Sequence, residues 1–357
     1  MSAYFFVFIL VLILNRFLPD RTPKQYRWNL FWTFLPLFIF GAIRVDFGND
    51  YIAYKATFEE IKAMENLIID KDMHEEVGYQ LLNFILPSYR SILVLTSLLM
   101  CLSYGMFIYH NVPHKYVWLF LILLCLNPEK NVYGTLVGIR NGIVVSGILL
   151  STVMIQKRKI IPFVAISLLM MSIHTSAILF LPIAYTCGIN REFTRKEMFV
   201  WIGGIVVCLL FGMSSLVNMI MPFITDNFER YEVYLQSEMQ SGGLIVVTNL
   251  FFVAIFIAFI MRSSRILLPE QRTIMRIGML FLCCTFFGIS SLRTSNYYNL
   301  FFLASLVIMI SKEYFNKLVV FALIIFAILV SCYSTFFVWM GSQWWDHSTY
   351  HSLWGNW

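Results

Sequence analysis

Three arginines and one histidine border apolar runs of this sequence, and their side chains suit a phosphate-bearing substrate. Arg44, Arg140, His174 and Arg293 each stand where a hydrophobic hairpin reaches the membrane surface, in "GAIRVDFGND", "TLVGIRNG", "MSIHTSAIL" and "SSLRTSNYYN". An ionisable side chain at such a depth is costly unless it faces water or a partner. Arginine presents a planar fork of N–H donors that matches phosphate oxygens, so the set predicts a diphosphate site.

Each of these residues also has a simpler structural interpretation. A single arginine at a helix end commonly anchors the helix by reaching to the membrane surface, and a single histidine commonly packs inside the protein. Asp46 and Asp50 follow Arg44 closely and are candidate ion-pair partners for it. Tyr51 and Tyr54 are typical of the aromatic belt at a membrane surface. The hypothesis of one shared site depends on all four ionisable residues lying on the face where basic residues are scarce.

The composition predicts that these residues are positioned by membrane-spanning helices. Of 357 residues, 59% are hydrophobic and 13% are charged, whereas a soluble domain is nearer one half and one quarter. The apolar runs are continuous, and several approach or exceed the length that crosses a bilayer as a helix. We predict an all-α, polytopic integral membrane protein with a single transmembrane domain over residues 1–357. About twelve apolar segments lie near residues 3–15, 28–43, 91–109, 115–127, 139–156, 160–173, 175–189, 198–223, 244–261, 274–292, 297–311 and 317–340.

The distribution of charge predicts the orientation of these segments. Six alternate connections contain 17 of the 26 basic residues and 5 of the 20 acidic ones. By the positive-inside rule these connections are cytoplasmic. Both termini, the loops at about 44–90 and 224–243, and a C-terminal tail at about 341–357 are then external. The net charge of +6 is therefore a topology signal, and no nucleic-acid partner is expected.

Local patterns refine this prediction at three places. Segments 160–173 and 175–189 are short for a bilayer and predict tilted helices or a re-entrant pair, with His174 at a turn reached from outside. In the first external loop, "FEEIKAMENLI" has the spacing of a short amphipathic helix. Trp344 and Trp345 lie in the aromatic tail, where they are belt residues or stacking faces for sugar rings. All seven cysteines fall in apolar segments, without metal-binding spacing.

Several stretches together resemble a known family. "IRVDFGNDYIAYKATF" is similar to the R-x-x-x-G-x-D-Y-x-x-Y motif of the EpsG family, the Wzy-type polymerases of bacterial exopolysaccharide and O-antigen. "GIRNGIVVSGILLS", "IHTSAILFLPIAY" and "LRTSNYYNLFFL" look like later signatures of that family in the expected order. The resemblance covers roughly residues 30–310, and no family pattern matches the tail "WWDHSTYHSLWGNW".

The resemblance implies a membrane glycosyltransferase with a GT-C-like architecture in the bacterial inner membrane. Such an enzyme moves a growing glycan from polyprenyl diphosphate to the non-reducing end of a lipid-linked repeat unit, on the periplasmic or external face. Its partners would be the lipid-linked donor and acceptor, the bilayer and a chain-length regulator. No cofactor and no metal are expected, and there is no Gly-rich phosphate loop that would indicate a nucleotide sugar.

On this interpretation, each residue has an expected role. Arginines would stabilise the departing diphosphate, a base would accept the proton of the acceptor hydroxyl, and aromatic rings would contact the glycan. Asp50 is favoured slightly as the base, because it is adjacent to Tyr51. The diphosphate ligands would be Arg44, Arg140 and Arg293, the candidate bases Asp50, Asp46 and His174, and the glycan-binding residues Tyr51, Tyr54, Tyr297, Trp344 and Trp345.

Three other functions fit parts of the pattern. A ligase that transfers the finished glycan to another acceptor would share the donor chemistry. A transporter or flippase for lipid-linked oligosaccharide would spread cations along a path and usually contain internal repeats, neither of which is visible. A membrane acyltransferase would want a catalytic histidine near the cytoplasm, which disagrees with the predicted external position of His174.

Overall fold

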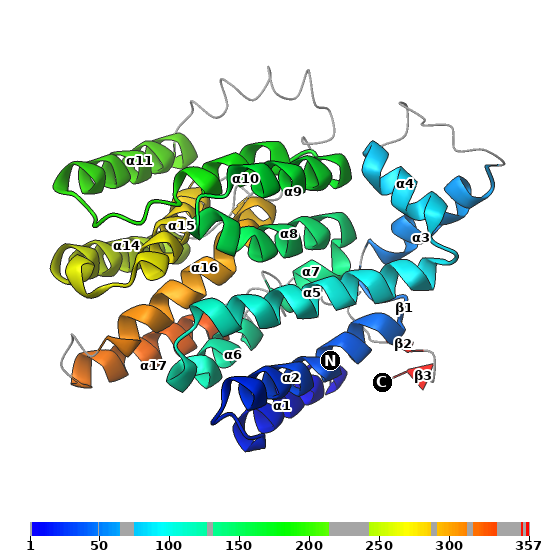
Figure 1. Cartoon of the computed structure of the whole chain (residues 1–357), viewed down its shortest axis with the longest axis horizontal. Coiled ribbons are helices and arrows are strands. Elements are labelled where there is room, and N and C mark those ends of the chain that lie inside the picture. The colour runs from blue at the N-terminus through cyan, green and yellow to red at the C-terminus, as the bar shows by residue number, and fades with distance from the viewer. Residues whose placement is uncertain are drawn as a thin grey trace.

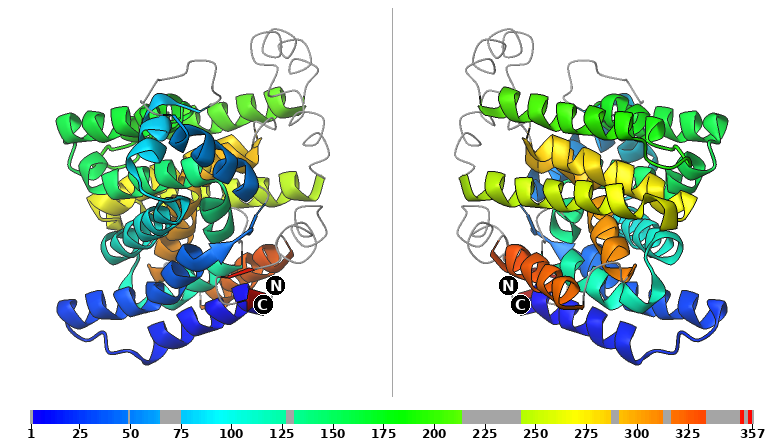
Figure 2. Two further views of the ribbon diagram at one scale, coloured as in Figure 1. Left: turned by 90° about the vertical axis from the view of Figure 1, so that its right-hand side faces the viewer. Right: turned by 90° about the vertical axis from the view of Figure 1, so that its left-hand side faces the viewer.

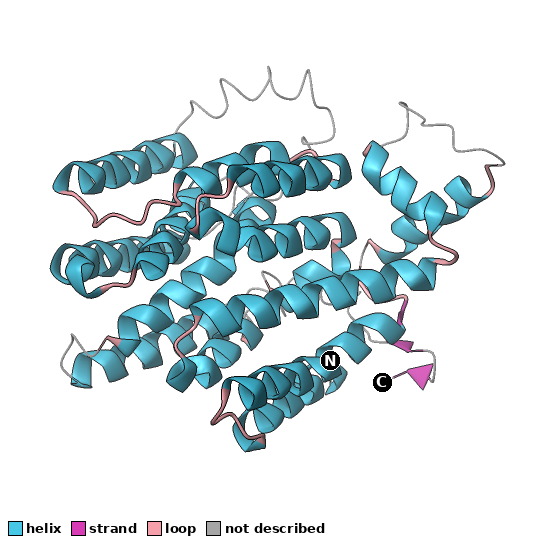
Figure 3. Cartoon of the chain, in the orientation of Figure 1, coloured by secondary structure: helices cyan, strands magenta, loops and turns pink. Residues whose placement is uncertain are grey.

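The chain folds into a bundle of helices, as the continuous apolar runs predict. The computed structural model describes residues 2–48, 50–64, 75–126, 131–213, 243–286, 291–312, 317–333, 351–352 and 355–356. Figure 1 shows the long helices side by side, with α3 and α4 at one end of the bundle. The described strands are only two residues long each, as the colouring in Figure 3 makes clear.

The elements are, in chain order, α1 (Ser2–Phe17), α2 (Pro23–Ile43), β1 (Arg44–Val45), α3 (Tyr51–Lys62), α4 (Val77–Ile85), α5 (Tyr89–Asn111), η1 (His114–Tyr116), α6 (Val117–Cys125), α7 (Val132–Val137), α8 (Ile139–Gln156), α9 (Ile160–Ile173), α10 (Ala177–Thr186), α11 (Arg195–Met213), α14 (Gly243–Ser263), η3 (Ser264–Ile266), α15 (Pro269–Phe286), α16 (Ser291–Ser311), α17 (Lys317–Tyr333), β2 (His351–Ser352) and β3 (Gly355–Asn356).

Each of the twelve predicted apolar segments overlaps a helix, although the helices differ in length. Three stretches of the described chain are long and apolar enough to cross a bilayer: Tyr89–Asn111, Ile139–Gln156 and Asn249–Ile266. Shorter apolar helices include Ile160–Ile173, so segments 160–173 and 175–189 form a pair of short helices, α9 and α10. The count of twelve spans and the GT-C architecture stay predictions.

The structure differs from the sequence-based expectations for the first predicted external loop and for Arg293. The expected amphipathic helix is α3, but it begins earlier than predicted, at Tyr51, and ends at Lys62. Its apolar side is buried through Phe58 and Ile61. Residues 65–74 and the loop at 224–243, apart from Gly243 at the start of α14, lie outside the described residues. Arg293 was expected in a tight turn and instead lies in the first turn of α16, because the helix begins at Ser291.

Packing is most extensive where α5 lies between α2 and α8 and contacts both, and where α15 lies along α16. Figure 2 shows α1 and α2 on one side of the bundle and α9 to α11 on the opposite side. Part of the C-terminal tail returns to this bundle, because β2 pairs antiparallel with β1 and places His351 opposite Val45. The tail therefore meets the end of α2, where the predicted external loop begins.

Two glycines permit close approaches at this end of the bundle. Gly48 has a φ of +88°, which a residue with a side chain rarely adopts, and it turns the chain between β1 and α3. A Cβ atom at Gly78 would lie 2.6 Å from the carbonyl oxygen of Ser172, so only glycine lets α4 pack directly on α9. This contact sets the distance between the start of α4 and the turn at His174.

Replacing Gly78 with alanine should therefore destabilise the protein. The added methyl group would collide with backbone, and overpacking of this kind costs about 1–3 kcal/mol. We expect Gly78→Ala to lower the midpoint of thermal unfolding by a few degrees in detergent. Gly203→Ala is the matched control, because no atom lies within 4 Å of a Cβ built there. Equal midpoints for the two variants would contradict this packing.

Candidate functional site

A carboxylate that the sequence-based analysis did not single out joins two of the predicted site residues. Glu76 immediately precedes α4, and its side chain is 18% exposed. Its Oε2 atom accepts a hydrogen bond from Nη1 of Arg140 at 2.7 Å, and its Oε1 atom lies 3.0 Å from Nδ1 of His174. Oε1 also accepts from the backbone N–H and the hydroxyl of Thr175, at 2.9 and 2.8 Å. Helices α4 and α8 and the turn between α9 and α10 thus meet at one carboxyl group.

The electrostatics of this cluster keep Glu76 ionised. Burial opposes the charge, but hydrogen bonds from His174 and Thr175 and the positive charge of Arg140 outweigh it, so the pKa of the Glu76 carboxyl lies well below its ordinary value. An ionised carboxylate can only accept hydrogen bonds. Nδ1 of His174 must therefore carry the hydrogen that it shares with Glu76, which leaves Nε2 as the basic nitrogen of the neutral ring.

Arg140 lies between two aromatic rings as well as beside the carboxylate. The centre of its guanidinium is 5.8 Å from the ring centroid of Tyr54 and 5.8 Å from that of Tyr79. Tyr79 is fully buried on α4, whereas Tyr54 on α3 is partly exposed. The Arg140 side chain remains 21% exposed. These contacts hold the guanidinium in one place at the edge of the bundle while leaving part of its surface accessible.

The turn that carries His174 is tied to a distant part of the chain. His174 ends α9 and its side chain is 27% exposed. Two residues later, the hydroxyl of Ser176 lies 2.5 Å from that of Tyr297 on α16. Residues four apart share a face of a helix, so position 293 lies one turn before Tyr297 on the same face. The backbone of α16 thus brings Arg293 toward the His174 turn, and the side chain of Arg293 lies outside the described residues.

Arg44 does not share the environment of Arg140. Its side chain is 1% exposed, and its guanidinium donates to the carbonyl oxygens of Gly41 at 2.6 Å and Leu136 at 2.8 Å. It also contacts the hydroxyl of Ser97 at 3.3 Å. These bonds join the end of α2 to α5 and α7. The burial of Arg44 among protein groups favours a structural role over the predicted contact with diphosphate.

A second arginine, which the sequence-based analysis passed over, completes this structural connection. Nη1 of Arg90, at the start of α5, donates to the carbonyl oxygens of Ala42 at 2.7 Å and Arg44 at 2.8 Å. The last carbonyls of a helix have no partner within the helix, and Arg90 supplies one for the end of α2. Because both bonds come from one nitrogen atom, they do not need the forked shape of a guanidinium.

The other predicted site residues fall into three groups. Asp46 is exposed and has a positive φ of 48°, and Asp50 is the half-buried residue that precedes α3. Tyr51 and Tyr297 are buried, at 8% and 2% exposure, which disagrees with their predicted contact with a glycan. Burial follows from the packing of Tyr51 against Tyr89, with ring centroids 5.2 Å apart, and of Tyr297 against the Ser176 turn. Tyr54 is the partly exposed member of the predicted tyrosines.

Two further predicted residues, Trp344 and Trp345, lie outside the described residues. Within the described part of the chain, no group of three or more His, Cys, Asp or Glu side chains has the arrangement to hold a metal ion.

Neutralising Glu76 should destabilise the protein over a wide pH range. A carboxyl group whose pKa is lowered by folding stabilises the protein above its ordinary pKa, near 4.3, and that contribution is lost only as the pH falls toward the lowered value. Glu76→Gln would leave Arg140 without its charged partner, at a cost of about 2–4 kcal/mol. We expect its thermal midpoint to lie below that of the wild type by a similar margin at pH 7 and at pH 5.

Glu75→Gln is the matched control for this measurement. The Glu75 carboxylate contacts the hydroxyl of Thr57 at 3.4 Å, without the four contacts that Glu76 makes. A Glu76→Gln protein with the midpoint of the wild type would show that the cluster does not form as described.

No curated protein and no solved structure matches this chain. The model of one family, described as the EpsG family, matches residues 27–349 and so covers most of the chain. The match includes most of α2 and all of the elements from β1 to α17, and with them Glu76, Arg140 and the His174 turn. The chain therefore belongs to the EpsG family.

Proposed function

We propose that this protein polymerises a polysaccharide by transferring a growing glycan from polyprenyl diphosphate to a lipid-linked repeat unit. The EpsG family is associated with Wzy-type polysaccharide polymerases, and the apolar helices are those of a membrane protein. The observation that carries the proposal is the single carboxylate of Glu76 holding Arg140 and His174 together. Arg140 can stabilise a departing anion, and His174 can accept a proton.

In the proposed reaction Arg140 acts on the donor. The bond that breaks joins the anomeric carbon of the glycan to an oxygen of the diphosphate, and the electron pair stays with that oxygen. A diphosphate needs charge stabilisation to leave more than it needs a proton. Arg140 supplies a fixed positive charge in a partly buried position, where a preorganised group is most effective. Arg293 is the second candidate ligand, because its helix meets the His174 turn through Tyr297.

His174 acts on the acceptor in this scheme. The acceptor hydroxyl forms the new bond to the anomeric carbon and releases its proton to Nε2 of His174. The hydrogen bond to Glu76 favours the hydrogen on Nδ1, so Nε2 is the ring nitrogen that can accept the proton. We favour His174 over Asp50 and Asp46 as the base, because its contact with Glu76 orients the ring and favours one tautomer. Glu76 is a positioning residue, since it acts through the two side chains that it orients.

The site is proposed to open to the external face. Its three elements lie at the end of the bundle that carries α3 and α4, the helices of the predicted external loop (Figure 1). The opposite end of α8 leads into Lys157, Arg158 and Lys159, in a connection that the charge distribution predicts to be cytoplasmic. A glycan assembled on this side of the membrane would remain attached to its lipid until it is transferred.

Arg140→Lys tests the proposed role of Arg140. Lysine keeps the charge but cannot reproduce two parallel N–H donors on a planar fork. Losing one stabilising interaction of this kind lowers a rate on the order of 10²–10³-fold. We expect cells that make only the Arg140→Lys protein to lose long-chain polymer and accumulate single lipid-linked repeat units, although the protein reaches the membrane in normal amounts.

Arg90→Lys is the control, because Arg90 makes both of its bonds to carbonyl oxygens from one nitrogen atom. A lysine ammonium can donate both bonds, so this variant should make polymer of normal length. Normal polymer from Arg140→Lys would disprove the proposed diphosphate contact. Accumulation of full-length chains on lipid diphosphate would instead identify a ligase.

A further inference from the structure

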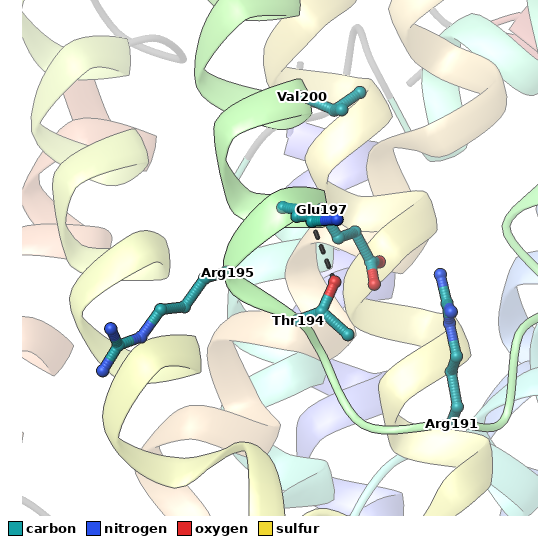
Figure 4. A pocket seen from close by; sticks show the side chains of 6 residues that line it. Arg191, Thr194, Arg195, Glu197 and Val200 are labelled. Atoms are coloured by element: carbon teal, nitrogen blue, oxygen red, sulfur yellow. Dashed lines mark hydrogen bonds between the residues drawn. The ribbon is translucent and has the colours of Figure 1, made fainter.

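The end of the bundle opposite Glu76 contains a basic hollow. It has a volume of about 590 Å³ and lies beside the first turn of α11, where Arg191, Thr194, Arg195, Lys196, Glu197 and Val200 line it. Figure 4 shows Arg191 and Arg195 on either side of Thr194, whose hydroxyl accepts from the backbone N–H of Glu197.

The two carboxylates near the basic side chains of the hollow already pair with other arginines. Both carboxylate oxygens of Glu197 accept from Arg276, at 2.6 and 3.1 Å, and Glu192 lies 3.8 Å from Arg272. Within the described part of the chain, the exposed side chains of Arg191, Arg195 and Lys196 form no ion pair. Three basic side chains therefore line the hollow without a matching carboxylate in the described part of the chain.

The wall of the hollow is held rigidly. Arg276 on α15 is 1% exposed, and it donates to the carbonyl oxygens of Ile189 and Arg191 as well as to Glu197. Its guanidinium also lies 4.0 Å from the ring centroid of Phe193. These contacts fix the segment before α11 and the first turn of the helix to α15. The basic side chains consequently project from a backbone that is already in place.

The position of the hollow indicates which anion it would take. Asn190 donates to the carbonyl oxygen of Gln156, so the segment lies at the end of α8, which by helix geometry is about 25 Å from Arg140. The charge distribution predicts that this end is cytoplasmic. Directly beyond the basic turn, α11 exposes apolar side chains, with Phe199 and Val200 each 73% exposed. A charged headgroup above an apolar strip matches the shape of a phospholipid.

We propose that this hollow binds the phosphate of an anionic phospholipid from the cytoplasmic leaflet, with the acyl chains along α11. Basic pockets between membrane helices bind anionic headgroups on the cytoplasmic side, where negatively charged lipids attract Lys and Arg. A free phosphate ion shares the chemistry of the headgroup but would not cover the apolar strip. The site is separate from the Glu76 cluster and does not depend on the proposed reaction.

Native mass spectrometry of the purified full chain can test this proposal. The protein in neutral detergent is titrated with phosphatidylglycerol and, separately, with phosphatidylcholine of the same acyl chains. Each basic side chain near an anionic group strengthens binding about fivefold. We expect phosphatidylglycerol to bind at least about tenfold more tightly to the wild type, and the triple variant Arg191→Gln, Arg195→Gln, Lys196→Gln to lose this preference.

The control removes the same charge elsewhere on the predicted cytoplasmic face. Arg21, Lys24 and Arg27 are exposed in the segment around the start of α2, and their triple replacement with Gln should leave the preference unchanged. Inorganic phosphate is added in a parallel titration and should not displace the lipid at millimolar concentration. Equal lipid preference in both triple variants would overturn the proposal. Displacement by phosphate would show that the hollow takes a soluble anion and not a lipid.

Discussion

A partly buried carboxylate is stable as a charge only where donors surround it, and Glu76 satisfies this condition with donors from two distant parts of the chain. Arg140, His174 and Thr175 supply four contacts to its two oxygens. Each partner is itself an ionisable or polar group at a position where burial is costly. The cluster therefore offsets the cost of partly burying the charges of Glu76 and Arg140. It also fixes the relative positions of α4, α8 and the turn after α9.

The surrounding packing makes this arrangement geometrically possible. Gly78 lets α4 approach the backbone of α9, and Gly48 turns the chain from the end of α2 into α3. Arg44 and Arg90 satisfy carbonyl oxygens around the end of α2 and connect it to α5 and α7. The arginines at this end of the bundle thus have different roles. Arg44 and Arg90 hold the backbone, whereas Arg140 keeps part of its guanidinium accessible beside Glu76.

The sequence was informative where the free-energy cost of placing a residue in or beside the membrane restricts the residue types that occur there. Continuous apolar runs predicted the helices, and the scarcity of basic residues on one face singled out Arg140 and His174. The pattern could not separate Arg140 from Arg44, because both look like arginines at helix ends. Only the fold shows that Arg44 is enclosed by carbonyl oxygens, while Arg140 meets a carboxylate.

Long-range pairing explains the other differences. Glu76 was missed because it is one of several acidic residues in the first loop, and its partners are 64 and 98 residues away. Tyr297 was expected to contact the glycan, but its ring is buried. Its hydroxyl forms a hydrogen bond with that of Ser176, which is 121 residues away. The contact of the tail strand β2 with β1 likewise joins residues far apart in the sequence, Val45 and His351. Such contacts leave no periodic signal in a single sequence.

The proposed reaction requires Glu76 to hold Arg140 and His174 in one site, where each acts on a substrate. An electron cryomicroscopy structure of the protein with a non-hydrolysable polyprenyl diphosphate glycan would test this requirement most directly. We expect diphosphate oxygens within hydrogen-bond distance of the Arg140 guanidinium, the anomeric carbon facing Nε2 of His174, and the contact between Glu76 and His174 retained. A diphosphate bound away from Arg140, with the Glu76 cluster unchanged and out of its reach, would show that these residues do not form the reaction site.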